Sequence, residues 1–504
     1  MKQYDVIIIG SGLGSLVCGA ILGKHGYSVC LYEKNRQIGG CMQTYARDKA
    51  IIDSGVHYIG SLDEGQVLNK IFSYLGIMDS LHLQRMDVDG FDYIHFNKEK
   101  KHYQLAQGYD RFIEQLLIDF PQERDALHAY CDAVKDVCSR FPLFNLRTGD
   151  ASEKEKVLGI DAAGFIRSIT DNQRLQQVLA GNNLLYAGVE NKTPFYVHAL
   201  VQNSYIESSW KCMDGGSQIA RALQKVIKQY GGDIVRNTEV KKIVGKDGVV
   251  DHITLADGRE ISGKYFISGL HPARTIAMTE HDSFRGAYRS RITSLENSPG
   301  TFMINAVLKP GTFPYLNYNY YHHATDSAWN GIHYTADNWP QTYGLFVSAG
   351  EGKLQYADNL SVMTYMRYEE VADWQHTFST DTYPDTRGAD YQAFKKERAE
   401  KLLNVVEEQF PGLRDCIHTY YVATPLTYRD YLAMPEGSMY GVAKDANDPL
   451  KTFISPATRL SNLYLTGQNM NLHGILGVTM SSIVTCAELV GMEQLVNEII
   501  ETNK

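Results

Sequence analysis

Hydrophobic and polar positions at the start of the chain follow the order strand, turn, helix, strand. Asp5 to Ile9 form a short β-branched run, which is typical of a strand buried on both faces of a parallel sheet. Ser15 to Lys24 then carry apolar residues at helical spacing, and Ser28 to Tyr32 form a second apolar run. The pattern predicts a β-α-β unit over the first forty residues.

Further along, the same periodicities predict a helix-rich middle and several separated strands. Helices are expected over 62–80, through most of 110–205, from Ser217 to Gly231 and over 474–489. Strands are expected over 234–244, 249–255, 261–268, 301–309, 361–366, 419–423 and 463–466. For the apolar face of 62–80 we prefer core packing to an apolar entrance for a ligand, and for the aromatic-rich stretch 314–344 we prefer sheet core to a ligand-facing surface.

The turn between the first strand and helix is rich in glycine. Gly10 allows a sharp turn, Gly12 lets the backbone approach a pyrophosphate, and a small residue at position 15 lets helix and strand pack closely. Ser15 is small, although Gly or Ala is usual there. Free N–H groups at the helix start then favour phosphate, and dipole interactions of this kind contribute about 0.3–1 kcal/mol.

The identity of the dinucleotide is predicted from the residues that follow the second strand. Glu33 lies 33 − 12 = 21 residues after Gly12, where an acid binds a ribose hydroxyl. Gly39-Gly40 is a second glycine pair, which FAD enzymes of the glutathione-reductase type carry and plain nicotinamide dehydrogenases usually lack. We therefore predict FAD as the resident cofactor.

Composition narrows the class of protein. At 504 residues the chain exceeds the size of a single core, so two or more domains are expected. A net charge of −9 and a pI of about 6.0 argue against a nucleic-acid partner.

The eight cysteines lack metal-ligand spacing, which indicates a reducing cytosol with no disulfide or metal site. The early first strand leaves no room for a signal peptide, and no run reaches the roughly 20 apolar residues that cross a bilayer. We expect a cytoplasmic protein that touches the inner face of a membrane peripherally.

The nucleotide-binding pattern is interrupted twice. It resumes at Met213 and again near Leu463, after long segments of different character. We predict an α/β fold: a discontinuous, Rossmann-like FAD-binding domain of the glutathione-reductase type with an inserted α+β substrate domain. The expected parts are FAD-binding residues 1–80, a helical substrate part over 81–207, FAD-binding residues 208–275, a mixed substrate sheet over 276–451 and FAD-binding residues 452–504.

Four segments together resemble a known family. They are VIIIGSGLGSLVCGAILGKHGYSVCLYEKNRQIGG, MDGGSQIARALQKVIKQYGGDIVRNTEVKKI, TPLTYRDY and NLYLTGQNMNLHGILGVTMSS. The chain resembles the phytoene desaturases, carotenoid isomerases and retinol saturases over nearly its whole length, with DSGVHYIG and LYLTGQ most similar to the saturase and isomerase branch. The Rab GDP-dissociation inhibitors share this architecture without FAD, so a non-redox lipid-binding escort is the alternative class.

The resemblance implies which residues bind FAD. The pyrophosphate is expected at Gly10, Gly12, Gly14 and Ser15, the adenosine ribose at Glu33, and the middle of the cofactor at Gly39 and Gly40. The predicted FAD-binding set also includes their neighbours Ser11, Lys34 and Cys41. The adenine is expected at Val240, and the ribityl chain and flavin ring are expected along Gly467, Asn469, Ile475 and Leu476. Asn469 stands where many relatives have Asp.

The resemblance also implies chemistry at carbon–carbon double bonds of a hydrophobic isoprenoid or polyene. Reduction is favoured, with desaturation and reduced-flavin cis/trans isomerisation as alternatives. Saturation needs a proton as well as a hydride, and His57, Tyr58 and His473 are the candidate donors, although the proton need not come from a side chain. Only one glycine-rich dinucleotide turn is present, so electrons are expected from transiently bound NAD(P)H or from an electron-donor protein.

Overall fold

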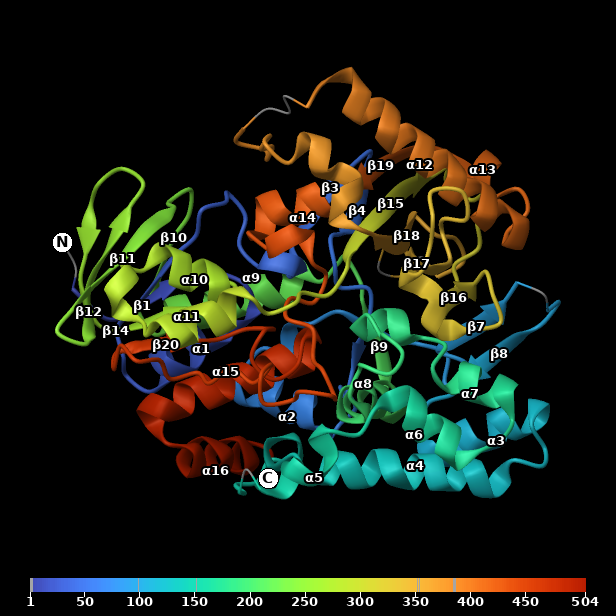
Figure 1. Ribbon diagram of the computed structural model, residues 1–504, viewed down its shortest axis with the longest axis horizontal. Helices are drawn as coiled ribbons and strands as arrows, with labels where there is room; N and C mark the ends of the chain where they lie inside the picture. Colours follow the sequence, from blue (N-terminus) through green and yellow to red (C-terminus); the bar gives the residue numbers. More distant parts are fainter. Residues whose placement is uncertain (1–2, 98, 151, 351, 353, 384–386) are drawn as a thin grey trace.

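A parallel sheet gathers strands from three distant parts of the chain. The computed structural model describes residues 3–97, 99–150, 152–350, 352, 354–383 and 387–504. The sheet has the order β10 (Asp233–Val235), β2 (Val29–Tyr32), β1 (Tyr4–Ile9), β14 (Gly263–Ser268) and β20 (Leu463–Leu465), and all four pairings are parallel. This is the predicted discontinuous Rossmann-like sheet, seen on the left of Figure 1.

Both faces of the parallel sheet are covered. Val6 and Ile8 pack with α1 (Leu13–Lys24), α9 (Ser217–Gln229) and α15 (Gly474–Val490) on one side. Ile7 and Ile9 pack on the other side, with β11 (Val240–Lys246), β12 (Val249–Leu255), α10 (Pro272–Met278) and α11 (Gly286–Thr293). The β-branched run of β1 is therefore buried on both faces, as its sequence predicts.

Two of the expected strands are each divided. The strand predicted over 234–244 is β10 and β11, which belong to different sheets, because Asn237 adopts a left-handed φ of 52° that redirects the chain between them. The strand predicted over 261–268 is β13 (Glu260–Ile261) and β14; β13 completes a small antiparallel sheet with β11 and β12. A continuous apolar pattern does not reveal such a change of partner.

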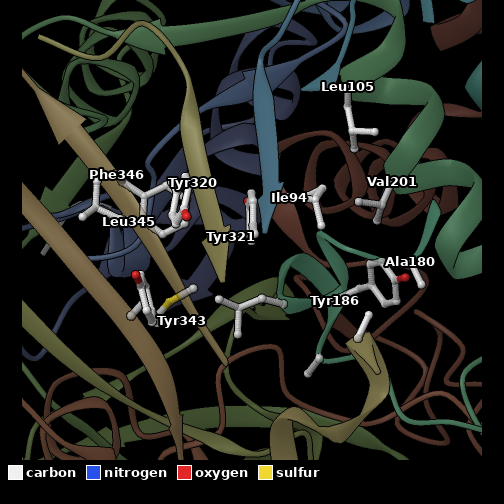
Figure 2. Packing of buried hydrophobic residues seen from close by; sticks show 14 of the residues in the cluster. Ile94, Leu105, Ala180, Tyr186, Val201, Tyr320, Tyr321, Tyr343, Leu345 and Phe346 are labelled. Atoms are coloured by element: carbon white, nitrogen blue, oxygen red, sulfur yellow. The ribbon is translucent and has the colours of Figure 1, made fainter. Parts of the chain in front are cut away.

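A seven-stranded mixed sheet forms the second half of the molecule. Its order is β19 (Ile417–Ala423), β15 (Gly300–Leu308), β18 (Asn359–Met366), β17 (Thr342–Ser348), β16 (Asn319–His323), β7 (Asp92–Phe96) and β8 (His102–Leu105). Tyr320, Tyr321 and Tyr343, from the aromatic-rich stretch, are buried in the core beside it, as Figure 2 shows. That stretch is sheet core, as preferred from the sequence.

Helices cover both sides of the mixed sheet in Figure 1. Below it lie α3 (Tyr109–Asp119), α4 (Arg124–Ser139), α6 (Ala162–Ile169) and α7 (Gln173–Leu179), with α5 (Ser152–Leu158) and α8 (Phe195–Glu207) nearby; above it lies α12 (Gly388–Gln409), followed by α13 (Leu413–Cys416). The expectation that 81–207 is helical is wrong at its start, because β6 (Leu83–Arg85), β7 and β8 occupy it. The partner of β6, which is β9 (Ser209–Cys212), and one partner of β7, which is β16, lie far away in sequence, and β8 pairs with β7.

The helix predicted over 62–80 is shorter than expected. It comprises α2 (Val67–Tyr74) and a 3-10 turn at Met78–Ser80. Leu68, Ile71 and Phe72 are fully buried, and α2 packs against α16 (Met492–Thr502). The apolar face is thus core, and it forms no entrance. Within the described residues, none of the helices combines the length and the apolar character needed to cross a bilayer.

Candidate functional site

The predicted glycine turn borders a cavity of about 330 Å³. Gly10 has a left-handed φ of 86°, and Gly12 is the N-cap of α1. A Cβ at Gly12 would meet no atom within 4 Å, so the space beside it is open, whereas a Cβ at Gly14 would lie 3.1 Å from the backbone of Gly467. The turn thus offers free backbone next to a helix start, the arrangement that binds phosphate.

Glu33 lies beside this turn at the end of β2. Its side chain is buried, and Oε2 accepts hydrogen bonds from the backbone N–H of Ser11 at 3.0 Å and from the Ser11 hydroxyl at 2.6 Å. Oε1 accepts from the N–H of Asn35 at 2.8 Å. The acid is therefore fixed at the cavity wall, where the sequence spacing predicts a ribose partner.

The second glycine pair approaches the first. Gly39 forms a bridge with Gly12, and a Cβ at Gly40 would lie 3.1 Å from the Cα of Gly12. The two glycine motifs therefore form one wall. Cys41 follows them, and burial raises the pKa of its thiol to about 11, so it stays a neutral thiol at pH 7.

The start of α15 and the end of β20 form the adjoining wall. Ile475 and Leu476, in the first turn of α15, line the cavity together with Gly467 and Asn469. The Asn469 Oδ1 atom accepts a hydrogen bond from the N–H of Val442 at 3.0 Å. Asn469 thus holds a neighbouring loop, a role that an uncharged amide performs without burying a charge.

Lys34 and Val240 complete the predicted set on the side of β2 and β11. The Lys34 ammonium donates a hydrogen bond to the carbonyl of Asp430 at 2.6 Å, and burial lowers its pKa. That carbonyl belongs to α14 (Pro425–Leu432), so Lys34 ties the Rossmann-like half to a helix packed against the mixed sheet. Val240 is buried at the start of β11.

The structure brings the predicted residues together with one exception. Those that line the cavity are Gly10, Ser11, Gly12, Gly14, Glu33, Lys34, Gly39, Gly40, Cys41, His57, Tyr58, Val240, Gly467, Asn469, His473, Ile475 and Leu476. Ser15 is fully buried, and a Cβ on Gly269 would lie 2.1 Å from its hydroxyl. Its side chain therefore serves the close packing of α1 on the sheet and is not part of the cavity wall.

The Tyr58 hydroxyl already forms hydrogen bonds within the protein. It donates to Asp92 Oδ2 at 2.9 Å and lies 2.8 Å from the Tyr321 hydroxyl, which then acts as the donor of that pair. Burial, with Asp92 and Tyr321 nearby, raises the pKa of Tyr58 well above its usual value. A phenol held in this way is a poor proton donor to a ligand.

The two histidines differ in their hydrogen bonds. His473 is the N-cap of α15, and its Nε2 lies 2.8 Å from the carbonyl of Leu185. The His57 ring stacks on Phe346, with 4.2 Å between centroids, and its Nε2 atom is buried without a partner among the described residues. Burial lowers the pKa of both imidazoles to about 4, so both are neutral at pH 7.

Two buried charged residues behind the cavity were missed from the sequence. Asp92 is fully buried on β7 and accepts hydrogen bonds from Tyr58, Asn182 and Asn319 at 2.9–3.0 Å; burial raises its pKa to about 6. Lys211 on β9 is also buried, and burial lowers its pKa to about 7. The sequence did contain one signal for Asp92: it is an acidic residue at the start of the apolar segment DYIHF.

A large apolar part of the remaining cavity wall comes from segments far apart in sequence. It includes Leu185, Leu200, Val201, Tyr205, Met303, Phe346, Met363 and Tyr440. These side chains belong to the helical part and the mixed sheet, so the cavity runs from the glycine turns to the second half of the molecule. Among the residues described, no group of three or more His, Cys, Asp or Glu side chains is placed to hold a metal ion.

Fold and cavity together define a dinucleotide-binding protein of the Rossmann-like class. A family model for the NAD(P)-binding Rossmann-like domain matches residues 8–75. Over its full length the chain is a distant homologue of the all-trans-retinol 13,14-reductases and prolycopene isomerases. It is 25% identical to all-trans-retinol 13,14-reductase of Homo sapiens, with 99% of this chain and 87% of that protein aligned. It is 24% identical to chloroplastic prolycopene isomerase of Daucus carota, over 98% and 81% respectively.

Solved structures support the fold. An oxidoreductase from Methanosarcina mazei is 17% identical, with a TM-score of 0.62 over 95% of this chain and 99% of that one. Putrescine oxidase is 12% identical, with a TM-score of 0.62 over 99% of each chain. Rab GDI from Plasmodium falciparum is 12% identical, with a TM-score of 0.54 over 97% and 98%. The α/β class with a parallel sheet and an additional mixed sheet is confirmed.

Proposed function

We propose that the chain is an FAD-dependent oxidoreductase that acts on a carbon–carbon double bond of a hydrophobic isoprenoid or polyene, with reduction favoured. The observation that carries the proposal is the single cavity lined by both glycine motifs and by the apolar wall of the mixed sheet. One such cavity brings a bound dinucleotide and an apolar ligand together. The full-length relatives, named as a retinol reductase and a prolycopene isomerase, support the substrate class.

The residues present fit FAD. The open space beside Gly12 would accept the pyrophosphate, and Glu33 stands where an acid binds the adenosine ribose. We assign the cofactor to Gly10, Ser11, Gly12, Gly14, Glu33, Lys34, Gly39, Gly40, Cys41, Val240, Gly467, Asn469, Ile475 and Leu476, and we assign Ser15 to packing. When bound, FAD supplies two-electron redox chemistry.

The side chains around the apolar end would hold the substrate and exclude water. Phe346, Met303 and Met363 offer an apolar wall without a charge. A polyene gains about 0.8 kcal/mol for each CH₂ that leaves water, but little when it leaves a membrane. The substrate would therefore be drawn from a bilayer surface, which is why we propose peripheral membrane contact.

Proton supply follows from the protonation states in the cavity. His57 and His473 are neutral at pH 7, and the Tyr58 hydroxyl is committed to Asp92. None of the three is a strong acid in this state. Among them His57 alone has a fully buried nitrogen without a partner in the described structure, and it remains our candidate for contact with the reacting substrate.

Desaturation and cis/trans isomerisation use the same cavity and stay as alternatives within the enzyme class. Transient NAD(P)H or an electron-donor protein would supply electrons. A lipid-binding escort is the alternative of another class, because Rab GDI from Plasmodium falciparum has the same overall fold. One relative is itself named an inactive all-trans-retinol 13,14-reductase, from Danio rerio, at 23% identity.

Reconstitution with FAD tests the proposal first. The purified chain is incubated with FAD, freed of excess by gel filtration, and examined for the visible spectrum of a bound flavin, with Gly12→Val as the matched control. We expect about one flavin per chain in the wild type and much less in the control. A wild-type protein that retains no flavin but still binds a polyene would refute the enzyme and favour the escort.

A further inference from the structure

A lysine outside the cavity holds the cavity wall at the start of α15. Lys444 does not line the cavity, but its ammonium donates hydrogen bonds to the carbonyls of Asn469 at 3.2 Å and Met470 at 2.8 Å. A third hydrogen bond goes to the carbonyl of Thr452 at 3.1 Å. An ammonium has three N–H donors, so all of them are used. Lys444 thus fixes the loop between β20 and α15, to which the cavity-lining Asn469 belongs.

The segment that carries Lys444 makes a second contact with the same loop. The N–H of Val442 donates to Asn469 Oδ1, as described above, and a Cβ at Gly441 would overlap that oxygen. The carbonyl of Gly441 in turn accepts a hydrogen bond from the N–H of Ser298 at 2.7 Å. The main chain therefore fixes the position of Lys444 beside the cavity wall, in addition to the hydrogen bonds of its ammonium.

The positive charge of Lys444 is not balanced by a carboxylate. Among the described residues, none of the Asp and Glu side chains forms an ion pair with it, and the charged neighbour that affects its pKa is another cation, Lys154. Carboxylates favour the charged form of the other buried lysines, Lys34 and Lys211. Buried charges are usually paired or bound to a metal, so a lysine held by carbonyls alone indicates a use for its charge.

The electrostatic effect of Lys444 extends to the cavity. Burial, and in smaller part the Lys444 cation, lowers the pKa of His473 to about 4, and His473 lines the cavity. His473 is also the N-cap of the 17-residue helix α15, whose N-terminal end is the positive end of its dipole. Two positive contributions therefore act at the wall of Ile475 and Leu476, where the flavin ring is expected.

Positive charge at this wall would act on the redox chemistry of FAD. Two-electron reduction of an oxidised flavin, with uptake of one proton, adds one negative charge to the ring. Charge near the ring nitrogens tunes the reduction potential of a flavin, and opposite charges attract more strongly in a protein interior than in water. A cation beside the ring therefore favours the reduced form.

We infer that Lys444 is a positioning residue that makes bound FAD easier to reduce, because it fixes the loop at Asn469 and holds an unbalanced positive charge beside the wall where the flavin ring is expected. This inference rests on the proposed function. It applies to reduction, desaturation and isomerisation alike, because each of these reactions involves the reduced flavin.

Equilibrium reduction of the FAD-loaded protein tests the inference without catalysis. The protein and a two-electron reference dye of known potential are reduced slowly together without oxygen, and both spectra are recorded. The experiment is done at pH 6, because burial lowers the pKa of Lys444 to about 7 and the ammonium is mostly protonated there. We expect Lys444→Met to shift the equilibrium between flavin and dye about tenfold toward oxidised flavin. This corresponds to about 1.4 kcal/mol and, for a two-electron couple, to about 30 mV.

Three further variants separate the charge of Lys444 from its hydrogen bonds. Lys444→Arg keeps the charge and should restore most of the wild-type equilibrium. Lys444→Gln keeps N–H donors without the charge, so it should behave like Lys444→Met and provides the test if that variant does not fold. Lys154→Met is the matched control: Lys154 lies over the Phe453 ring at 5.3 Å and has no hydrogen bond to Asn469 or Met470 in the described structure, so its removal should shift the equilibrium less.

An unchanged flavin–dye equilibrium in both Lys444→Met and Lys444→Gln would overturn the inference and leave the proposed function standing. A shift in Lys444→Arg as large as that in Lys444→Met would also overturn it, because the effect would then come from the geometry of the loop and not from charge. An equal shift in Lys154→Met would show that any nearby cation has this effect and would remove the special role of Lys444. A wild-type protein that binds no FAD would overturn the inference and the proposed function together.

Discussion

Asp92→Asn is the perturbation for which the structure gives the most detailed expectation. Asp92 is fully buried beneath Tyr58, and burial raises its pKa from 3.8 to about 6. The folded state therefore holds the Asp92 proton more tightly than the unfolded chain does. Loss of that proton favours unfolding, so this group's contribution to stability falls as the pH rises through the interval between 3.8 and about 6 and levels off within about 1.5 pH units above it.

The magnitude follows from the shift. A difference of about 2 pKa units corresponds to about 3 kcal/mol in total, and about 1.4 kcal/mol of it falls between about pH 5 and pH 7.5. The Asp92→Asn variant has no carboxyl group at this position, so it lacks this pH-dependent contribution. It should fold, because the Asn319 amide, whose Oδ1 atom is buried without a partner among the described residues, can rotate to accept a hydrogen bond from the new amide.

Calorimetry of both proteins at a series of pH values measures the effect. The unfolding midpoint temperature of the wild type minus that of Asp92→Asn should fall as the pH rises from about 5 to about 7.5. The effects of the other carboxylates cancel in this difference, so the change reports Asp92 alone. Asp92→Leu serves as the comparison variant. It removes the acceptor for the Tyr58, Asn182 and Asn319 donors, so it should lower the stability of the folded protein at every pH. A difference between wild type and Asp92→Asn that does not change with pH would refute the raised pKa.

Three other predictions concern the two ends of the cavity. Gly12→Val should lower FAD affinity about tenfold or more, because overpacking costs about 1–3 kcal/mol; a variant that binds FAD as tightly as the wild type in equilibrium dialysis would contradict the phosphate site. Glu33→Gln should lower the free energy of unfolding by about 1.5–3 kcal/mol, because the hydrogen bonds from Ser11 become weaker, and it should also weaken FAD binding. Denaturant unfolding measures the loss of stability, and an unchanged denaturation midpoint would contradict it. Lys211→Met should raise the pKa of His57, because a nearby cation now opposes its protonation; an NMR titration of the His57 ring that does not move would exclude this coupling.

The Rossmann-like half was predictable because its signals are local. Strand β1, the glycine turn and α1 follow one another within about twenty residues, and each step limits the next. Glu33 and Gly39 then lie at distances along the chain that a β-α-β unit fixes. For Ser15 the sequence predicts both close packing and a place at the pyrophosphate, and the contact that favours packing comes from Gly269, which is remote in sequence.

The substrate end could not be predicted in the same way. Strands β7 and β16 pair although more than two hundred residues separate them, and their short apolar patterns do not identify a partner. Asp92 and Lys211 were missed because their hydrogen-bond partners are spread over the helical part and the mixed sheet. His57 was found as a candidate because it lies within DSGVHYIG, but its unpartnered nitrogen is evident only in the folded protein.

Anaerobic turnover of the reduced, flavin-loaded protein with all-trans-retinol tests the central claim most directly. The protein is photoreduced, the polyene is added, and the flavin spectrum and the mass of the product are followed together. The account predicts reoxidation of the flavin and a product that is heavier by two hydrogens. A flavin that stays reduced while the polyene is unchanged, or changes only its double-bond geometry, would contradict reduction as the activity of this chain.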